Sequence, residues 1–256
     1  MAGEPILMMW AHPRSFSTAF ARAMVARGDH LVVHEPLCTL YDVGEVEVPG
    51  PDGAMVRCAT VENVFRNLRD RASIEPLFVK ETTDHRYEEV LHAPELVDGI
   101  RHAFLLREPF ATIASHFAVN PCVSRDEIGY EHLHEVFRAV SSRGDYRPLV
   151  IDGDRFVAEP EAAIRRFCRW AGIPYRAEAM KWRSEARVEW SRTRKWHRGV
   201  DESTEIRRRE SRYEDTPDNN AVLRSFLEYH RPFYDKLKRE VDSTSEGDLL
   251  SPERWS

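Results

Sequence analysis

The chain has 256 residues, enough for one large domain or two small ones. A hydrophobic fraction of 42%, a charged fraction of 31% and a formal net charge of −6 indicate a globular protein and disfavour a general nucleic-acid binder. Four widely spaced cysteines, no recognisable signal peptide and no apolar run of roughly 18 residues predict a reduced, cytoplasmic protein without a membrane span.

The N-terminal region is predicted to form a strand, a loop, a helix and a second strand. Residues 6–11 are a continuous apolar run, typical of a strand that is buried on both faces. The helical spacing of residues 19–27 ends at Gly28, a residue type favoured just after a helix. Residues 31–36 begin with a second apolar run. This order predicts a β–α–β unit.

Residues 37–58 interrupt this pattern. They contain a cluster of turn residues, PGPDG, at positions 49–53. We therefore expect an irregular excursion over this segment, which could act as a lid.

Strands and helices alternate through most of the remaining chain. Strands are predicted at 77–80, 102–107 and 148–153, and helices at 60–73, 109–117, 126–142, 161–172 and 220–239. Short apolar strands that alternate with helices favour an α/β fold around a mainly parallel sheet of about five strands. We expect one domain over residues 1–240 and a disordered tail over 241–256, which is rich in Ser, Asp and Glu.

One late segment differs from the rest in charge. Residues 181–212 hold 11 Lys and Arg against 6 Asp and Glu, whereas the whole chain is acidic. Such a segment either binds an anionic partner or forms a solvated surface.

The loop between the first strand and the first helix has the composition of an anion site. It reads HPRSFST over residues 12–18. A helix N-terminus offers backbone N–H groups to an anion, and Arg14 adds a cationic fork. No GK[ST] motif occurs anywhere in the chain, which disfavours ordinary ATP or GTP hydrolysis. The alternative is that Ser17 and Thr18 only cap the helix.

A second candidate anion site follows the fourth predicted strand. Arg107 ends that strand, and Ser115 lies eight residues further along the chain on the next predicted helix. Ligands of open α/β sheets bind at the carboxyl ends of the strands, so the two side chains could hold one phosphate. Either residue alone is better explained without a ligand, Arg107 as part of a surface ion pair and Ser115 as an ordinary helical serine.

Together these motifs resemble the sulfotransferases that use 3′-phosphoadenosine 5′-phosphosulfate (PAPS). The resemblance spans roughly residues 5–205 and is strongest to a bacterial sulfotransferase-like branch. The matching segments are Pro13-Arg14-Ser15-Phe16-Ser17-Thr18, His34-Glu35-Pro36, Lys80 with His85, Arg107 with Ser115, and Trp196-His197.

The resemblance implies a P-loop-like, three-layer α/β/α fold and a nucleotide site. In that family the loop equivalent to residues 13–18 binds the 5′-phosphosulfate, while Arg107 and Ser115 would bind the 3′-phosphate. A late basic loop would close over the nucleotide, and its members here are Arg194, Trp196, His197 and Arg198. Most members have Gly where this chain has Phe16, and Gly allows a positive φ at the phosphate.

The implied reaction is in-line sulfuryl transfer to a hydroxyl or amine, with no metal and with PAP as the product. We assign Arg14 and Lys80 to the sulfuryl and bridging oxygens, because charge develops there. The general base is either Glu35, at the end of the second strand, or His85, on the loop after the third. Glu35 could instead pair with Arg14, and His85 could be a surface residue.

The acceptor is predicted to be a small molecule. Its pocket would come from residues 37–58, 118–130 and 176–192, with aromatic candidates Tyr41, Phe117, Trp182 and Trp190. Two other functions stay open, a P-loop-type small-molecule kinase and a non-catalytic nucleotide-binding module. The sequence leaves the oligomeric state open, a homo-oligomer included.

Overall fold

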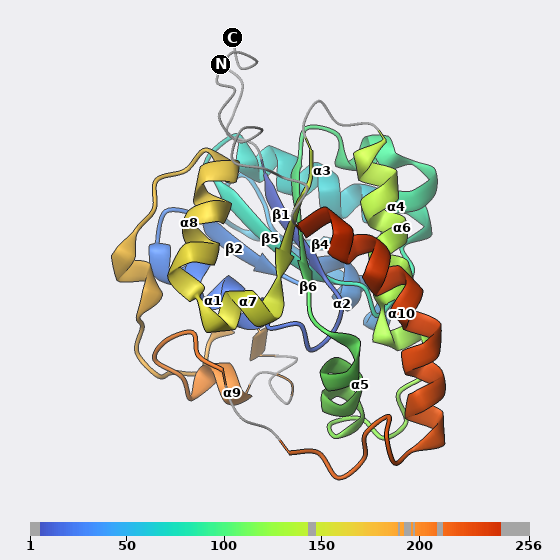
Figure 1. Cartoon of the computed structure of the whole chain (residues 1–256). Coiled ribbons are helices and arrows are strands. Elements are labelled where there is room, and N and C mark those ends of the chain that lie inside the picture. The colour runs from blue at the N-terminus through green and yellow to red at the C-terminus, as the bar shows by residue number, and fades with distance from the viewer. Residues whose placement is uncertain are drawn as a thin grey trace.

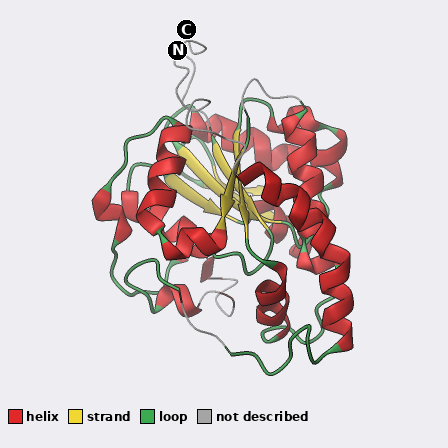
Figure 2. Ribbon diagram, viewed as in Figure 1, coloured by secondary structure: helices red, strands yellow, loops and turns green. Residues whose placement is uncertain are grey.

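A computed structural model describes residues 6–142, 147–188, 190–191, 196, 198–208 and 212–241. Figure 1 shows a central sheet between two layers of helices, and Figure 2 shows that the strands lie inside these layers. The expected α/β/α architecture is therefore confirmed.

The central sheet has five parallel strands in the order β2-β5-β1-β6-β7. They are β1 (Leu7–Ala11), β2 (Leu31–His34), β5 (Leu77–Thr82), β6 (Arg101–Leu106) and β7 (Leu149–Asp152). Each lies at a position that the apolar runs predicted. Because β1 is central and the chain continues first to one side and then to the other, the carboxyl end of β1 is where an α/β sheet binds ligands.

The two faces of β1 belong to two different cores. Met8 and Trp10 pack into one hydrophobic cluster, and Leu7, Met9 and Ala11 pack into the other. This alternation follows from the two-residue period of a strand, and it requires apolar side chains at every position. A continuous apolar run is therefore what the central strand of a covered sheet needs.

Helices cover both faces of the sheet. One face carries α1 (Ser17–Arg27), α7 (Gly153–Ala158) and α8 (Pro160–Ala171). The other carries α3 (Val61–Ala72), α4 (Glu88–His92), α6 (Tyr130–Ser141) and α10 (Ala221–Val241). The remaining helical elements of the described chain are α2 (Pro36–Val43), α5 (Pro109–Phe117), η1 (Pro94–Val97), η2 (Asp126–Ile128), η3 (Ala177–Met180) and α9 (Arg198–Asp201).

The predicted irregular excursion over 37–58 is wrong. This segment folds into α2 (Pro36–Val43) and an antiparallel hairpin of β3 (Val46–Pro49) and β4 (Met55–Cys58). Val46 and Val48 are buried against the core while Glu47 is exposed. The turn cluster at 49–53 was correctly recognised, but it connects two short strands that alternate between buried and exposed positions.

Two helix boundaries also differ from the prediction. The expected helix over 126–142 is broken at Gly129, which has φ 83° and separates η2 from α6. A Cβ there would lie 2.6 Å from the carbonyl oxygen of Thr83. Both the positive φ and this lack of space therefore favour glycine at the break. At the other end of the domain, α10 includes the buried Val241, the first residue of the expected tail.

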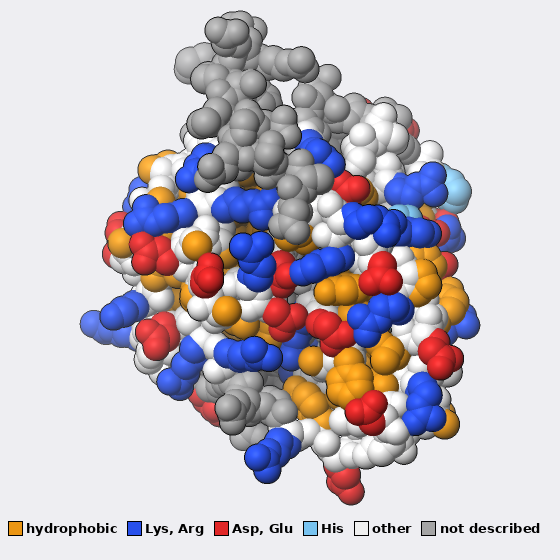
Figure 3. Space-filling view, in the orientation of Figure 1, with side chains coloured by type: hydrophobic (Ala, Val, Ile, Leu, Met, Phe, Trp, Pro, Cys, Tyr) orange, Lys and Arg blue, Asp and Glu red, His pale blue; other side chains and the backbone are white. Residues whose placement is uncertain are grey.

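Two surface properties bear on function. Within the described residues, no helix combines the length and apolar character needed to cross a membrane. On the face drawn in Figure 3, Lys and Arg side chains are interspersed with Asp and Glu. That face therefore offers no broad surface of one charge among the residues shown in colour.

Candidate active site

A cavity of about 450 Å³ lies at the carboxyl edge of the sheet, beside the loop that follows β1. It is lined by loop residues 13–18 and by side chains that follow the other central strands. The candidate residues on its wall are Glu35, Lys80, His85, Arg107, Ser115 and Trp196. Sequence-distant candidates therefore converge on one cavity of the size that small ligands occupy.

The loop before α1 has an unusual backbone. Arg14 and Phe16 both have positive φ, 63° and 73°, although neither is glycine. Phe16 is the residue just before α1 and sits in the left-handed region that a glycine would occupy freely. A side chain there costs about 1–2 kcal/mol. Phe16 thus reaches the backbone conformation that a glycine would supply.

The loop presents polar groups that no described residue satisfies. The Ser15 hydroxyl is fully buried and has no hydrogen-bond partner within the described chain. In the same set of residues, the backbone N–H groups of Ser15, Phe16 and Ser17 donate to no other backbone carbonyl. An unsatisfied buried polar group costs about 1–3 kcal/mol, so a bound anion would relieve this cost.

Arg107 and Ser115 are both connected to Arg14. Arg107 Nη1 donates to the carbonyl oxygen of Arg14 at 3.0 Å, and Arg14 Nε donates to Ser115 Oγ at 3.1 Å. The Arg107 guanidinium also lies 4.2 Å from the centre of the Phe16 ring. Arg14 Nη1 donates to the Trp196 carbonyl at 2.8 Å. The two predicted anion sites are therefore adjacent and are linked through Arg14.

His12 links the loop to the backbone of Arg107. Its Nδ1–H donates to the Pro13 carbonyl at 2.9 Å, and its Nε2 accepts from the backbone N–H of Arg107, also at 2.9 Å. Burial lowers the pKa of His12 to about 3, so the imidazole is neutral. His12 is a positioning residue with one fixed tautomer.

Glu35 and Lys80 line the same cavity and form a buried ion pair. Lys80 Nζ donates to Glu35 Oε1, and the side chains are only 1% and 8% exposed. The second oxygen, Oε2, lies 3.6 Å from His34 Nδ1. Glu35 has φ 51°, so it too is left-handed. The suggested pairing of Glu35 with Arg14 is wrong, because Lys80 takes that place on the neighbouring strand.

Glu81 follows Lys80 on β5 and binds the start of α2. Its carboxyl oxygens accept from the backbone N–H groups of Leu37 at 2.7 Å and Cys38 at 3.2 Å, at the start of α2. Burial, and secondarily the charge of Glu35, raises the pKa of Glu81 to about 8. The fully buried Glu81 therefore fixes α2 relative to β5.

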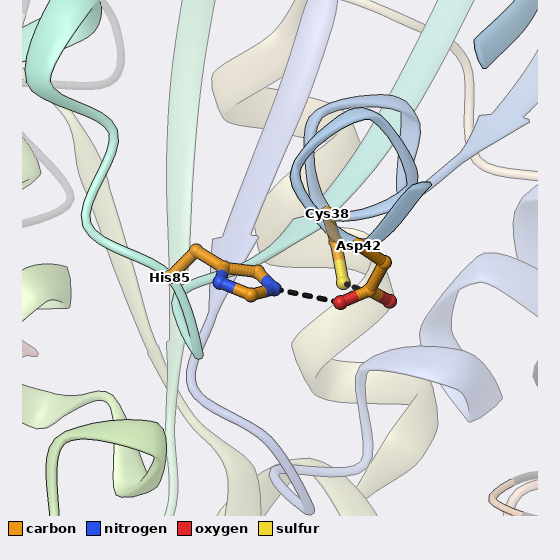
Figure 4. A group of neighbouring side chains, drawn as sticks. All are labelled: Cys38, Asp42 and His85. Carbon is orange, nitrogen blue, oxygen red and sulfur yellow. Dashed lines mark hydrogen bonds and ion pairs between the residues drawn. The ribbon is translucent and has the colours of Figure 1, made fainter. Parts of the chain in front are cut away.

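His85 lies in a separate cluster of the same cavity. Its Nε2 lies 2.9 Å from Asp42 Oδ1, and the thiol of Cys38 points at Asp42 from one turn earlier on α2 (Figure 4). Asp84 accepts from the Cys38 thiol at 3.6 Å and from Thr82 Oγ1 at 2.7 Å. Burial, and next Asp84, raises the pKa of the Cys38 thiol, so the free thiol is neutral.

A second cavity, of about 1000 Å³, adjoins the first along the edge strand β2. Within the described chain, Glu35 is the one residue that lines both cavities. Trp190 lines the second, whereas Tyr41, Phe117 and Trp182 line neither. Three of the four predicted aromatic residues therefore do not face these cavities.

Some residues that line the cavity were not predicted from the sequence, and some predicted residues lie outside the described part of the chain. The residues missed include Cys38, Asp42, Asp84, His116, Arg207 and Tyr213. Recognising α2 as a helix would have put Cys38 and Asp42 on one face, four residues apart. Arg194 and His197 lie outside the described residues, as does the side chain of Arg198.

Comparison with known proteins decides the family. The sequence profile described as "Sulfotransferase domain" matches residues 6–240. The chain belongs to the sulfotransferase family. Its fold is shared with a sulfotransferase of Mycobacterium avium, at a TM-score of 0.50, 14% identity, and coverage of 94% of this chain and 78% of that one. The sulfotransferase domain of the Synechococcus olefin synthase gives a TM-score of 0.50 and 14% identity, with coverage of 70% and 77%.

Two curated relatives come from Arabidopsis thaliana and bear a different name. Branched-chain-amino-acid aminotransferase-like protein 1 is 27% identical over 252 residues, which is 96% of this chain and 44% of that protein. Branched-chain-amino-acid aminotransferase-like protein 2 is 28% identical over 182 residues, 69% of this chain and 32% of that protein. This sulfotransferase-family chain thus spans less than half of the relatives it matches.

Proposed function

We propose that this sulfotransferase-family chain moves the sulfuryl group of PAPS to a hydroxyl or amine of a small acceptor. The observation that carries the proposal is the convergence of the loop at 13–18 with Arg107 and Ser115 on one cavity. A phosphosulfate and a separate 3′-phosphate need two cationic, donor-rich places. The loop N–H groups with Ser15 suit the first, and Arg107 with Ser115 suits the second.

In the transfer, the acceptor oxygen or nitrogen attacks sulfur in line with the bridging oxygen. A new bond to sulfur forms, the sulfur–oxygen bond to PAP breaks, and the acceptor proton passes to a base. Lys80 and Arg14 would stabilise the negative charge that develops on the sulfuryl and bridging oxygens. Both cations line the cavity, and we propose that the transfer needs no metal.

Glu35 is our first choice of base. It lines both cavities, so it lies between the nucleotide loop and a space for an acceptor. Its pairing with Lys80 puts the base next to the cation that assists the leaving group. Glu35→Gln should therefore lower turnover by about 10²–10⁴-fold and leave PAP binding within twofold. Full activity of this variant would move the role to His85, whose substitution by Gln is the matched comparison.

The decisive binding experiment is calorimetric titration with PAP and with ATP, both in EDTA. We expect micromolar or tighter binding of PAP and much weaker binding of ATP. Arg107→Ala should weaken PAP binding at least tenfold. Arg165→Ala, which removes an exposed arginine paired with Glu161, should not change it. Equal or better binding of ATP would instead favour the kinase, which needs Mg²⁺ for turnover.

The non-catalytic module makes a different prediction. It would bind PAP with the same dependence on Arg107 but would show no transfer to any acceptor. A wide acceptor screen with labelled PAPS separates the two, and release of the label as a sulfated product excludes the module.

A further inference from the structure

The cavity contains a second group of reactive side chains. The proposed transfer assigns no joint role to this group. We name it the Cys38 cluster, and its members are Cys38, Asp42 and His85. One ligand atom from each residue lies within 4.8 Å of the other two. We propose that the Cys38 cluster binds a divalent transition-metal ion of the zinc class.

The arrangement of the chain explains why these atoms meet. Cys38 and Asp42 are four residues apart on α2, which puts both on one face of that helix. His85 comes from the loop after β5 and points its Nε2 at them (Figure 4). The helix is itself held to β5 by the two bonds from its first turn to Glu81. Two of the ligands therefore sit on a fixed element, as a preformed metal site requires.

The spacings fit a tetrahedral ion. With Zn–S near 2.3 Å and Zn–O or Zn–N near 2.1 Å, tetrahedral angles put sulfur about 3.6 Å from oxygen and nitrogen about 3.4 Å from oxygen. The Cys38 sulfur lies 3.9 Å from Asp42 Oδ2, and His85 Nε2 lies 2.9 Å from Asp42 Oδ1. Because the three ligand atoms lie within 4.8 Å of one another, shifts of up to about 1 Å would bring them onto one ion. Asp42 and His85 are 48% and 31% exposed, so their side chains have room to make them.

The ligand types select the metal. Thiolate and imidazole together suit zinc, and three protein ligands leave the fourth position for water or substrate. That position would open to the cavity, which all three side chains line. Coordination releases the thiol proton to solvent and leaves the charge of the ion balanced by Asp42 and the thiolate.

Asp84 is a charged neighbour of the thiol. Its Oδ2 lies 3.6 Å from the Cys38 sulfur, and its Oδ1 accepts from Thr82 Oγ1. Once coordination has released the thiol proton, this carboxylate repels the thiolate, so Asp84 opposes coordination by Cys38 and does not assist it. The cluster therefore has three direct ligands, and the charge of Asp84 acts against one of them.

Titration of the metal-free full chain with Co²⁺ tests the site, because a cobalt–thiolate bond gives a charge-transfer absorption. We expect one Co²⁺ per chain with this band, displaced by Zn²⁺. Cys38→Ser should abolish the band, and Asp84→Asn, which removes the charge that faces the thiolate, should not weaken binding. Cys122→Ser removes an exposed thiol outside the cluster and should leave the band unchanged.

Three results would overturn the proposal. They are no thiolate band in the wild-type chain at millimolar Co²⁺, a band that survives in Cys38→Ser, and a band that is lost equally in Cys122→Ser. If Cys38→Ser does not fold, His85→Gln gives the same test from a partly exposed side chain, and unchanged cobalt affinity there would count against the site.

The consequence for transfer rests on the proposed function and is tested separately. An ion on the Cys38 cluster holds the His85 imidazole, so His85 could not then accept the acceptor proton. Zn²⁺ would inhibit transfer if His85 is the base and would leave proton removal to Glu35 otherwise. The cobalt spectrum needs no transfer activity, so failure of the metal site and failure of the sulfotransferase assignment are distinguishable.

Discussion

Phe16 gives a direct test of the loop that would hold the phosphosulfate. We compare Phe16→Gly with Phe16→Ala. Both variants lose the ring and its contact with the Arg107 guanidinium, so these losses cancel in the comparison. The two differ only in the Cβ, at a position with φ 73° and ψ 12°.

The magnitude follows from two opposing effects. The left-handed conformation costs a residue with a Cβ about 1–2 kcal/mol and costs glycine almost nothing. Glycine loses more backbone entropy on folding, which offsets about 0.5–1 kcal/mol. We therefore expect Phe16→Gly to be more stable than Phe16→Ala by about 1 kcal/mol, or roughly 2–4 °C in melting temperature for a chain of this size.

Urea unfolding of both variants measures the difference, and a helical position supplies the control. Ala163 lies in α8 with ordinary helical geometry, so Ala163→Gly should destabilise by about 0.5–1 kcal/mol. The exchange of Ala for Gly thus changes sign between the two positions. If Phe16→Ala is as stable as Phe16→Gly, the loop is not left-handed at this residue, and the argument for its N–H groups fails.

Two further predictions concern stability. Gly129→Ala should destabilise clearly more than Gly99→Ala in the same urea assay, because both positions have positive φ but only at Gly129 would the Cβ meet a carbonyl, 2.6 Å away. Burial lowers the pKa of His12 to about 3 and of His102 to about 4. Each therefore binds a proton on unfolding below about pH 6.5, so the free energy of unfolding should fall as the pH drops from 6.5 to 4, with a shallower slope in His12→Gln. An equal slope in the variant would contradict the neutral, buried His12.

The sequence predicted the sheet well because its signals are local and strong. Each parallel strand is covered on both faces, so it must be apolar at every position, and such runs are visible without knowledge of the fold. The loop at 13–18 was also recognisable, since it needs small polar residues between a strand and a helix. That Arg107 contacts this loop came only from the structure.

The contacts of Glu35 and of the Cys38 cluster were harder to predict from the sequence. The partner of Glu35 is decided by strand order, because Lys80 becomes its neighbour only when β5 lies beside β2. The Cys38 cluster depends on α2, a helix of eight residues in a segment dominated by turn residues. A single sequence cannot show which helix face meets which strand end when the helix itself is not recognised.

The strained backbone positions lie at the cavity. Within the described chain, the three non-glycine residues with positive φ are Arg14, Phe16 and Glu35, and all three line the first cavity. At about 1–2 kcal/mol each, they cost a substantial part of a typical folding free energy of about 5–15 kcal/mol. Such strain persists where the surrounding structure enforces it, and it concentrates at functional sites. Two of these residues lie in the loop at 13–18, and the third places a carboxylate beside Lys80, so the strain coincides with groups that the proposed transfer needs.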